Sequence, residues 1–233
     1  MTDQGSLANL LTENRSFAPD PTFAANAVAQ PGIYEEARAD RLAFWAKQAR
    51  NLHWHKPFTQ VLDWSNAPFA RWFHDGQLNV AYNCLDRHVL EGRGDRVAIH
   101  FEAEDGSSLA ITYADLLARV SKAANALTEL GVGKGDRVAI YMPLIPEAVT
   151  AMLACARVGA IHSVVFGGFS AEALRSRIED ASAKLVITSD GQFRRGSASP
   201  LKPAVDEAVD MLENEALQAP VVAAIEAWLK ARV

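Results

Sequence analysis

The sequence has few cysteines and no long apolar run, and both absences restrict what the chain can be. Only Cys84 and Cys155 occur among 233 residues, so we expect no disulfide framework and a reducing cytoplasm. The longest mostly apolar stretches, 148–158 and 161–169, are well short of the roughly 20 residues that a membrane-spanning helix needs. Residues 1–30 have no basic start followed by an apolar run, so they do not read as a secretory signal.

Neither the charge of the chain nor the spacing of its His and Cys residues indicates a binding function. The formal net charge is -5, with no run of Lys or Arg, so neither nucleic acid nor a membrane surface is an expected partner. His53 and His55 flank Trp54, and Cys84 precedes His88 by four positions, but no second pair follows at metal spacing. We therefore predict no metal site. The composition, 49% hydrophobic and 22% charged, is that of an ordinary globular protein.

The two ends of the chain read differently from its middle. Residues 1–31 are rich in Ala, Asn, Asp, Ser and Pro without a sustained period, which indicates a flexible arm. Residues 33–51 follow the period of one amphipathic helix, and 52–89 combine aromatics with turn formers, which predicts an irregular segment that buries its aromatics. Beyond residue 209 a helical pattern resumes, carried by Glu213, Leu217, Val221, Ile225, Trp228 and Leu229.

From Gly94 onward, short β-branched runs alternate with helical patterns. The predicted strands are 97–102, 138–142, 162–166 and 185–188. The helix signals are Thr112 as a cap with Gly131 at the far end, a second helix from Pro146 to Gly159, and Ser170 as the cap of a third. This βαβαβαβ succession predicts an α/β fold with a mostly parallel sheet and helices on its faces.

Ligands of such sheets gather beyond the carboxyl ends of the strands, so the loops there are the candidate sites. After the third strand, Phe166 is followed by Gly167 and Gly168 at the start of a helix, which lets a backbone approach an anion closely. The alternative is a tight turn in which Ser170 merely caps the helix. The glycine-rich run 131–136 follows a helix and lacks a GKS or GKT ending, so we read it as a turn.

The loop after the fourth strand, 189–197, contains two adjacent cations. Arg194 and Arg195 precede Gly196 and Ser197, a plausible phosphate clamp because Arg offers a planar donor fork and Gly admits a phosphate closely. The alternative is a solvated pair of arginines on a surface loop. No paired carboxylates and no nucleophile-and-base arrangement stand out, so no catalytic residue is predicted.

Four segments together resemble one family. LNVAYNCLDRH (78–88), GDRVAI (94–99), GDRVAIYMPLIPEAVTAMLACAR (135–157) and HSVVFGGFS (162–170) resemble the acetyl-CoA synthetases, acetate–CoA ligases of the acyl-adenylate-forming superfamily. The resemblance runs from about residue 34 to 209. It implies an extension of this family at 32–92 and the beginning of its AMP-binding domain at 93–209, with the arm 1–31 and the helical tail 210–233 outside.

The resemblance also implies a chemistry. The family joins acetate to ATP, releases pyrophosphate, and passes the acetyl group from the adenylate to the thiol of coenzyme A. It implies that Phe166, Gly167 and Gly168 lie along the coenzyme A nucleotide, and that the stretch Arg194, Arg195, Gly196 and Ser197 holds its phosphates and adenine end. The family has Arg or Lys where this chain has Ser197, so one expected cation is missing.

Other parts of the family pattern are not in these 233 residues. The TSGTTGxPKG-type phosphate loop, the Mg²⁺ site, the acyl pocket and the catalytic lysine of the family would lie beyond Val233. We therefore expect a partial acetate–CoA ligase that is inactive alone; a non-catalytic remnant or interaction module without nucleotide binding is the alternative. A NAD-binding oxidoreductase is set aside because 102–112 contains only Gly106. Acetate against propionate, and the oligomeric state, stay open.

Overall fold

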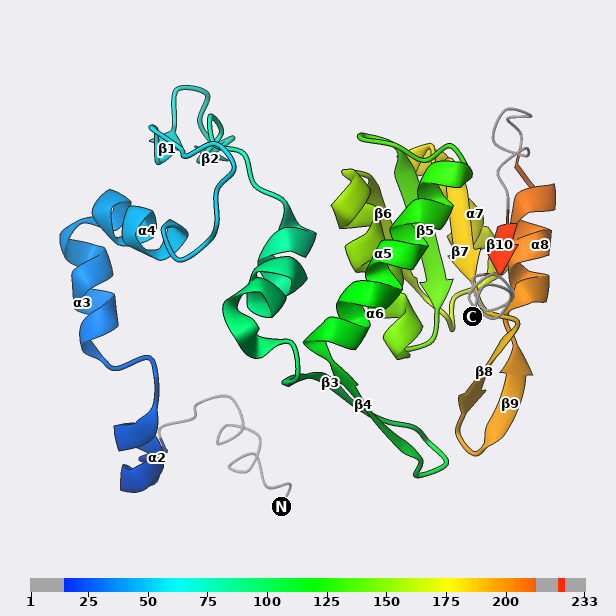
Figure 1. Ribbon diagram of the computed structural model, residues 1–233, viewed down its shortest axis with the longest axis horizontal. Coiled ribbons are helices and arrows are strands. Elements are labelled where there is room, and N and C mark those ends of the chain that lie inside the picture. The colour runs from blue at the N-terminus through cyan, green and yellow to red at the C-terminus, as the bar shows by residue number, and fades with distance from the viewer. Residues whose placement is uncertain (1–14, 213–221, 225–233) are drawn as a thin grey trace, which may run out of the picture. The chain divides into compact units, whose positions relative to one another are not determined.

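The computed structural model describes residues 15–212 and 222–224 (Figure 1). The chain forms two compact units. One comprises residues up to 52 together with 60–73, and the other comprises 53–59 together with 74 onward. The residues that carry the candidate site all belong to the second unit.

The first unit contains short helices and one small hairpin. Its elements are α2 (Pro21–Asn26), α3 (Gly32–Ala39), α4 (Arg41–Ala49) and the antiparallel pair β1 (Leu62–Asp63) and β2 (Arg71–Trp72). Part of the predicted flexible arm, 21–26, is helical in the structure: the Asp20 carboxylate accepts hydrogen bonds from the amides of Thr22 and Phe23, at 2.9 and 3.0 Å, and so starts α2. Residues 1–14 of that arm lie outside the described part.

The single helix predicted for 33–51 is divided at Asp40. Its backbone leaves the helical region (φ -150°, ψ 96°), and its carboxylate accepts from the Ala43 amide at 2.9 Å. A short carboxylate side chain competes with the helical backbone in this way, so Asp40 ends α3 and caps α4.

The segment predicted to be irregular, 52–89, ends in a helix. Two π-helical turns, η1 (Tyr82–Asp86) and η2 (Val89–Arg93), lie within the helical stretch 80–93. The expectation that the aromatics of this segment are buried also fails in part: Trp64 and Phe69 are 53% and 71% exposed. Trp54 and Phe58 do pack edge to face, with ring centroids 5.1 Å apart.

The parallel sheet confirms the predicted fold class. Its strands lie in the order β10 (Val222–Ala224), β7 (Leu185–Thr188), β5 (Arg137–Met142) and β6 (Ile161–Phe166), all parallel to their neighbours. The short strand β10 falls in the tail, where the pattern predicted a helix, so that prediction is wrong at 222–224. The six residues that carried the helical pattern lie outside the described part.

The first predicted strand is present but does not join this sheet. β3 (Val97–Glu102) pairs antiparallel with β4 (Ser108–Thr112), in a hairpin that the sequence pattern did not reveal. The turn between them holds Gly106 at φ +82° and Asp105, whose carboxylate accepts from the Ser107 amide at 2.9 Å. Because this turn reverses the chain at once, β3 has its partner before the first crossover helix begins.

The predicted helices are confirmed with their caps. α5 (Tyr113–Glu129) starts at Thr112, whose hydroxyl accepts from the Asp115 amide at 3.1 Å. α6 (Pro146–Val158) ends at Gly159 in the left-handed region, and α7 (Ala171–Ala181) starts at Ser170. A further helix, α8 (Lys202–Asp210), follows an antiparallel hairpin formed by residues 191–200.

Strand β5 is buried on both faces and separates two hydrophobic cores. Val138, Ile140 and Met142 belong to the core that contains the apolar residues of α5 and α6. Ala139 and Tyr141 belong to the core that contains those of α7 and α8. Since alternate residues of a strand point to opposite faces, α5 and α6 cover one face of the sheet and α7 and α8 the other (Figure 1).

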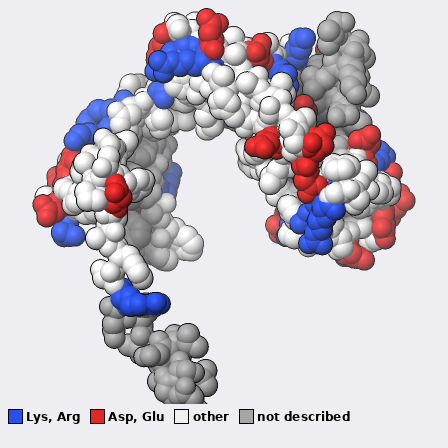
Figure 2. All heavy atoms as spheres, turned by 90° about the horizontal axis from the view of Figure 1, so that it is seen from below, with Lys and Arg blue, Asp and Glu red and all other residues white. Residues whose placement is uncertain are grey.

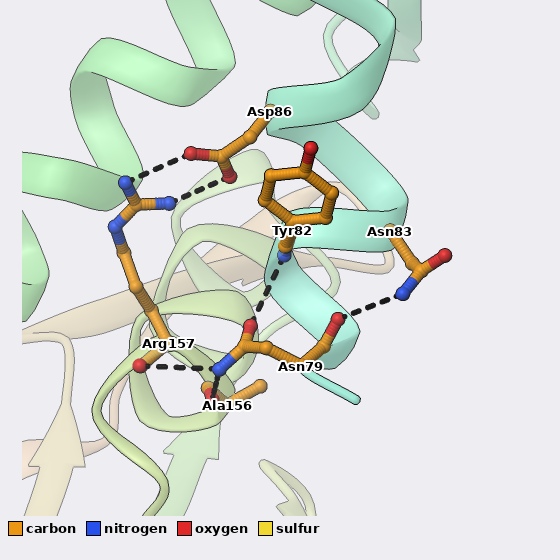
Figure 3. A network of polar contacts seen from close by, with 6 residues as sticks. All are labelled: Asn79, Tyr82, Asn83, Asp86, Ala156 and Arg157. Carbon is orange, nitrogen blue, oxygen red and sulfur yellow. Dashed lines mark hydrogen bonds and ion pairs between the residues drawn. The ribbon is translucent and has the colours of Figure 1, made fainter. Parts of the chain in front are cut away.

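A polar network fastens the helical stretch 80–93 to α6 (Figure 3). The Asn79 side chain accepts from the Tyr82 amide at 3.1 Å and donates to the carbonyl oxygen of Ala156 at 3.0 Å, so it serves the start of one helix and the end of the other. Asp86 and Arg157 form a two-pronged ion pair, with N–O distances of 2.7 and 3.0 Å. Their side chains are 18% and 32% exposed, which limits screening by water.

This geometry predicts that Asp86→Ala destabilises the second unit by about 1–3 kcal/mol, because it leaves a half-buried guanidinium without its charged partner. The matched control is Asp206→Ala, since Asp206 pairs with Lys202 on the surface of α8 with half of its side chain exposed. That control should change stability by no more than about 0.5 kcal/mol. Urea unfolding measures both variants, and equal losses would contradict the role given to the Asp86–Arg157 pair.

Candidate phosphate-binding site

A cleft of about 470 Å³ lies beyond the carboxyl ends of the parallel strands. Because β6 and β7 flank β5 on opposite sides, the chain leaves the central strand first to one side and then to the other, which is where open α/β sheets form their ligand crevices. The β3–β4 hairpin, the loop after β5 and the segment after β7 contribute to its walls. Its lining includes Glu104, Pro143, Leu144, Phe166, Gln192 and Arg194.

Two residues that the sequence did not single out hold the loop after β6. The Tyr141 hydroxyl donates to the carbonyl oxygen of Phe169 at 2.8 Å, and the Gln192 side-chain amide donates to that of Gly167 at 3.1 Å. Burial raises the pKa of the Tyr141 phenol, which keeps it protonated as a donor. Local sequence carries no sign of either contact, because the partners lie at least 25 residues apart in the chain.

Two side chains lie close over Gly168. A Cβ atom at this position would lie 2.8 Å from the Phe166 ring and 2.9 Å from Nη1 of Arg194, so a larger residue would force these side chains to shift. The Arg194 guanidinium in turn lies over the Phe166 ring, 5.0 Å from its centroid. The structure thus brings together three of the predicted site residues, from the loop after β6 and the segment after β7.

A second arginine, missed by sequence reasoning, extends this stack. Phe166 and Phe169 meet edge to face with centroids 5.9 Å apart, and Arg177 of α7 lies 4.7 Å from the Phe169 centroid. Arg177 also donates to the carbonyl oxygen of Ala173 at 2.8 Å. Two cations therefore flank the ring pair, although Arg177 is anchored on its own helix.

The predicted loop 189–197 is a hairpin in the structure. β8 (Gly191–Arg194) pairs antiparallel with β9 (Ser197–Pro200), and the two-residue turn has Arg195 at φ +55° and Gly196 at φ +77°. Two left-handed residues in succession match the twist of a tight hairpin. The prediction failed because Arg at the first turn position is not a recognisable hairpin signal, unlike Asn or Gly.

The turn's donors are already in use. The Glu104 carboxylate, from the β3–β4 loop, accepts from the amide of Arg195 at 2.7 Å and from that of Gly196 at 3.3 Å. Ser197 lies at the end of the same turn, with its hydroxyl 3.4 Å from the carbonyl oxygen of Arg194. Of the predicted residues, Phe166 and Arg194 line the cleft, Gly168 lies beneath them, and Gly167 accepts the hydrogen bond from Gln192. Arg195 and Gly196 form the hairpin turn, and Ser197 begins β9.

The start of α7 is capped by its own side chains. The Ser170 hydroxyl accepts from the Ala173 amide at 3.3 Å, and a hydrogen bond from Ser170 is the main reason that the pKa of Glu172 is lowered. A negative charge in the first turn already complements the helix dipole. Ser170 is therefore a cap, as the alternative interpretation had it.

The other reactive residue types do not form a competing site. Burial raises the pKa of the Cys155 thiol to about 12, so it is not a nucleophile at neutral pH.

Among residues 15–212 and 222–224, no group of three or more His, Cys, Asp and Glu could hold a metal ion. Within the same residues no helix is long and apolar enough to cross a membrane. Blue and red side chains occur in small groups beside each other in Figure 2, without a continuous basic area.

Comparison with known proteins gives the family. Residues 85–231 match the family of AMP-binding enzymes, and residues 31–84 match the acetyl-coenzyme A synthetase N-terminus. An acetyl-coenzyme A synthetase of Streptomyces avermitilis is 70% identical over 204 residues, which cover 88% of this chain and 31% of that protein. One of Mycobacterium tuberculosis is 68% identical over 195 residues (83% and 30%), and one of Burkholderia lata is 53% identical over 223 residues (93% and 34%).

The chain thus spans about a third of the length of the curated relatives it matches. Matches of this identity over most of the chain, together with the α/β architecture, agree with the resemblance seen in the four sequence segments. The chain belongs to the family of AMP-binding enzymes and corresponds to the N-terminal portion of an acetyl-coenzyme A synthetase.

Proposed function

We propose that this chain supplies one wall of the coenzyme A site of an acetate–CoA ligase. The complete enzyme would convert acetate, ATP and coenzyme A into acetyl-CoA, AMP and pyrophosphate through acetyl-adenylate. The observation that carries the proposal is the Arg194 guanidinium, which lies over Phe166 and Gly168 at a cleft beyond the strands of the sheet. The names of its relatives support the same reaction.

The chemistry of these residues suits a phosphate ester. Arg194 offers a planar fork of N–H donors that can hold two phosphate oxygens, and the Phe166 ring restrains the direction of that fork. Gly168 keeps the surface beneath open, since any side chain there would displace the guanidinium. Tyr141 and Gln192 hold the loop in position through their hydrogen bonds to the carbonyl oxygens of Phe169 and Gly167.

The remaining assignments follow the same proposal. Residues 32–92 would be the family's extension and 93–209 the beginning of its AMP-binding domain, in a cytoplasmic enzyme whose partners are acetate, ATP and coenzyme A. ATP and its Mg²⁺ would bind to other parts of the complete enzyme, and no catalytic residue is assigned to this chain. The described residues hold no cluster of carboxylates suited to Mg²⁺.

Two observations favour the alternative, a non-catalytic remnant or interaction module without nucleotide binding. Ser197 replaces a cation of the family pattern, and the Glu104 carboxylate occupies the two turn amides nearest to it. Both features reduce the attraction of the turn for phosphate. Measurement of coenzyme A dependence distinguishes the two functions.

The first functional prediction uses a completed chain, in which residues 1–209 are joined to the corresponding remainder of the Streptomyces avermitilis relative. Arg194→Ala should raise the KM for coenzyme A at least about tenfold, because a hydrogen bond to a charged group contributes about 1.5–3 kcal/mol. The KM values for ATP and acetate should stay within about twofold by the same reasoning. Initial rates at varied coenzyme A measure this effect.

The control is Arg119→Ala, which removes an arginine of α5 that does not line the cleft and that pairs with Glu147 at 3.9 Å. It should leave all three constants unchanged. If Arg194→Ala also leaves the KM for coenzyme A unchanged, the arginine is a solvated surface residue and the proposed wall is wrong.

The second functional prediction is that residues 1–233 alone do not form acetyl-adenylate. Adenylation requires preorganised donors for the β- and γ-phosphates while pyrophosphate leaves, and that electrostatic stabilisation is usually the largest catalytic contribution. Acetate-dependent exchange of labelled pyrophosphate into ATP is the assay, with the completed chain as the positive control. Exchange above background by the 233-residue chain would mean that the ATP site has been misassigned.

A further inference from the structure

Glu104 contacts the turn of the β8–β9 hairpin, and the proposed binding of coenzyme A does not explain this contact. Glu104 lies in the loop between β3 and β4, and its two carboxylate oxygens accept separately from the amides of Arg195 and Gly196, at 2.7 and 3.3 Å. The residues are 91 and 92 positions apart in the chain. An acidic side chain therefore occupies the part of the molecule where the proposal places an anionic ligand.

The backbone explains why a carboxylate fits there. Arg195 and Gly196 both have positive φ, +55° and +77°, so their amides point to the same side of the turn. Successive N–H groups arranged in this way form a small concavity that binds one oxyanion. A phosphate group, like a carboxylate, carries at least two terminal oxygens that accept hydrogen bonds, so it would use the same two donors.

Carboxylate and phosphate cannot share these donors. Each amide has one hydrogen, and a phosphate close to the Glu104 carboxylate would meet a like charge at short range. The contact is also exposed to solvent, so the Glu104 side chain can leave by rotation without unfolding the hairpin. Departure of Glu104 leaves the amides of Arg195 and Gly196 free to bind another oxyanion.

We propose that Glu104 is an internal competitor at the Arg195–Gly196 turn, which a phosphate group of the ligand must displace before it binds. The inference rests on the proposed function, because it takes the turn to be part of the coenzyme A site. In consequence Glu104 lowers the affinity of the site for coenzyme A. It also makes the site selective for ligands whose phosphate reaches these two amides.

The test is a titration of the ¹⁵N-labelled 233-residue chain with coenzyme A, followed through the amide signals of Arg195 and Gly196. Glu104→Gln removes the charge while it keeps the size of the side chain, and it should tighten binding roughly three- to tenfold. The control is Glu102→Gln. Glu102 is exposed, lies two residues away in the same hairpin and lines the same cleft, but its removal leaves the turn contact intact. It should change the dissociation constant by less than about twofold.

Arg194→Ala, titrated in parallel, separates two claims: that Arg194 belongs to the coenzyme A site, and that Glu104 competes with coenzyme A at the turn. Tighter binding by Glu104→Gln with weaker binding by Arg194→Ala supports both of them. Weaker or unchanged binding by Glu104→Gln, while Arg194→Ala still weakens it, overturns the competitor role and leaves the proposed site intact. An equal gain from Glu102→Gln also overturns that role, because it shows general charge repulsion. No response of the turn amides in any of the variants overturns both the competitor and the site.

Discussion

Burial of β5 on both faces is the constraint on which the rest of the second unit depends. Its neighbours β6 and β7 lie on opposite sides, and the two hydrophobic cores lie on opposite faces. Three parallel strands consequently end at one edge of the sheet, and the loops that follow them meet there. Tyr141, the residue before the last of β5, belongs to one of those cores and also holds the loop after β6. The same buried strand therefore supports both the core and the candidate site.

Features that depend on neighbouring residues were predictable from the sequence. Thr112, Gly159 and Ser170 mark helix ends because their caps involve contacts within a few residues, and the β-branched runs mark β5 and β7 because these strands are buried. β6 carries a similar run, although most of its residues are exposed. The pairing between strands was harder to predict from the sequence. β3 and the 189–197 segment look like a sheet strand and a loop, yet both form antiparallel hairpins whose tight turns carry weak sequence signals.

In the candidate site, too, local features were predictable from the sequence and long-range contacts were not. Gly168 and Arg194 were suspected from glycine pairs and adjacent cations, but their proximity depends on the register of β5 with β6 and β7. Glu104 could not be recognised, because a single acidic residue in a hairpin loop is ordinary and its partners lie about ninety residues further on. The resemblance of four segments to one family supplied the coenzyme A hypothesis, which charge and spacing alone did not distinguish from surface arginines.

The proposed coenzyme A site lies in the cleft beyond β5, β6 and β7, at Arg194 and the hairpin turn. A crystal structure of the chain grown with coenzyme A tests it most directly. The account predicts a ligand phosphate within hydrogen-bonding distance of the Arg194 guanidinium, roughly 2.7–3.2 Å between heavy atoms, above Gly168. Coenzyme A bound on another surface, with Arg194 still directed only at the Phe166 ring, would contradict it.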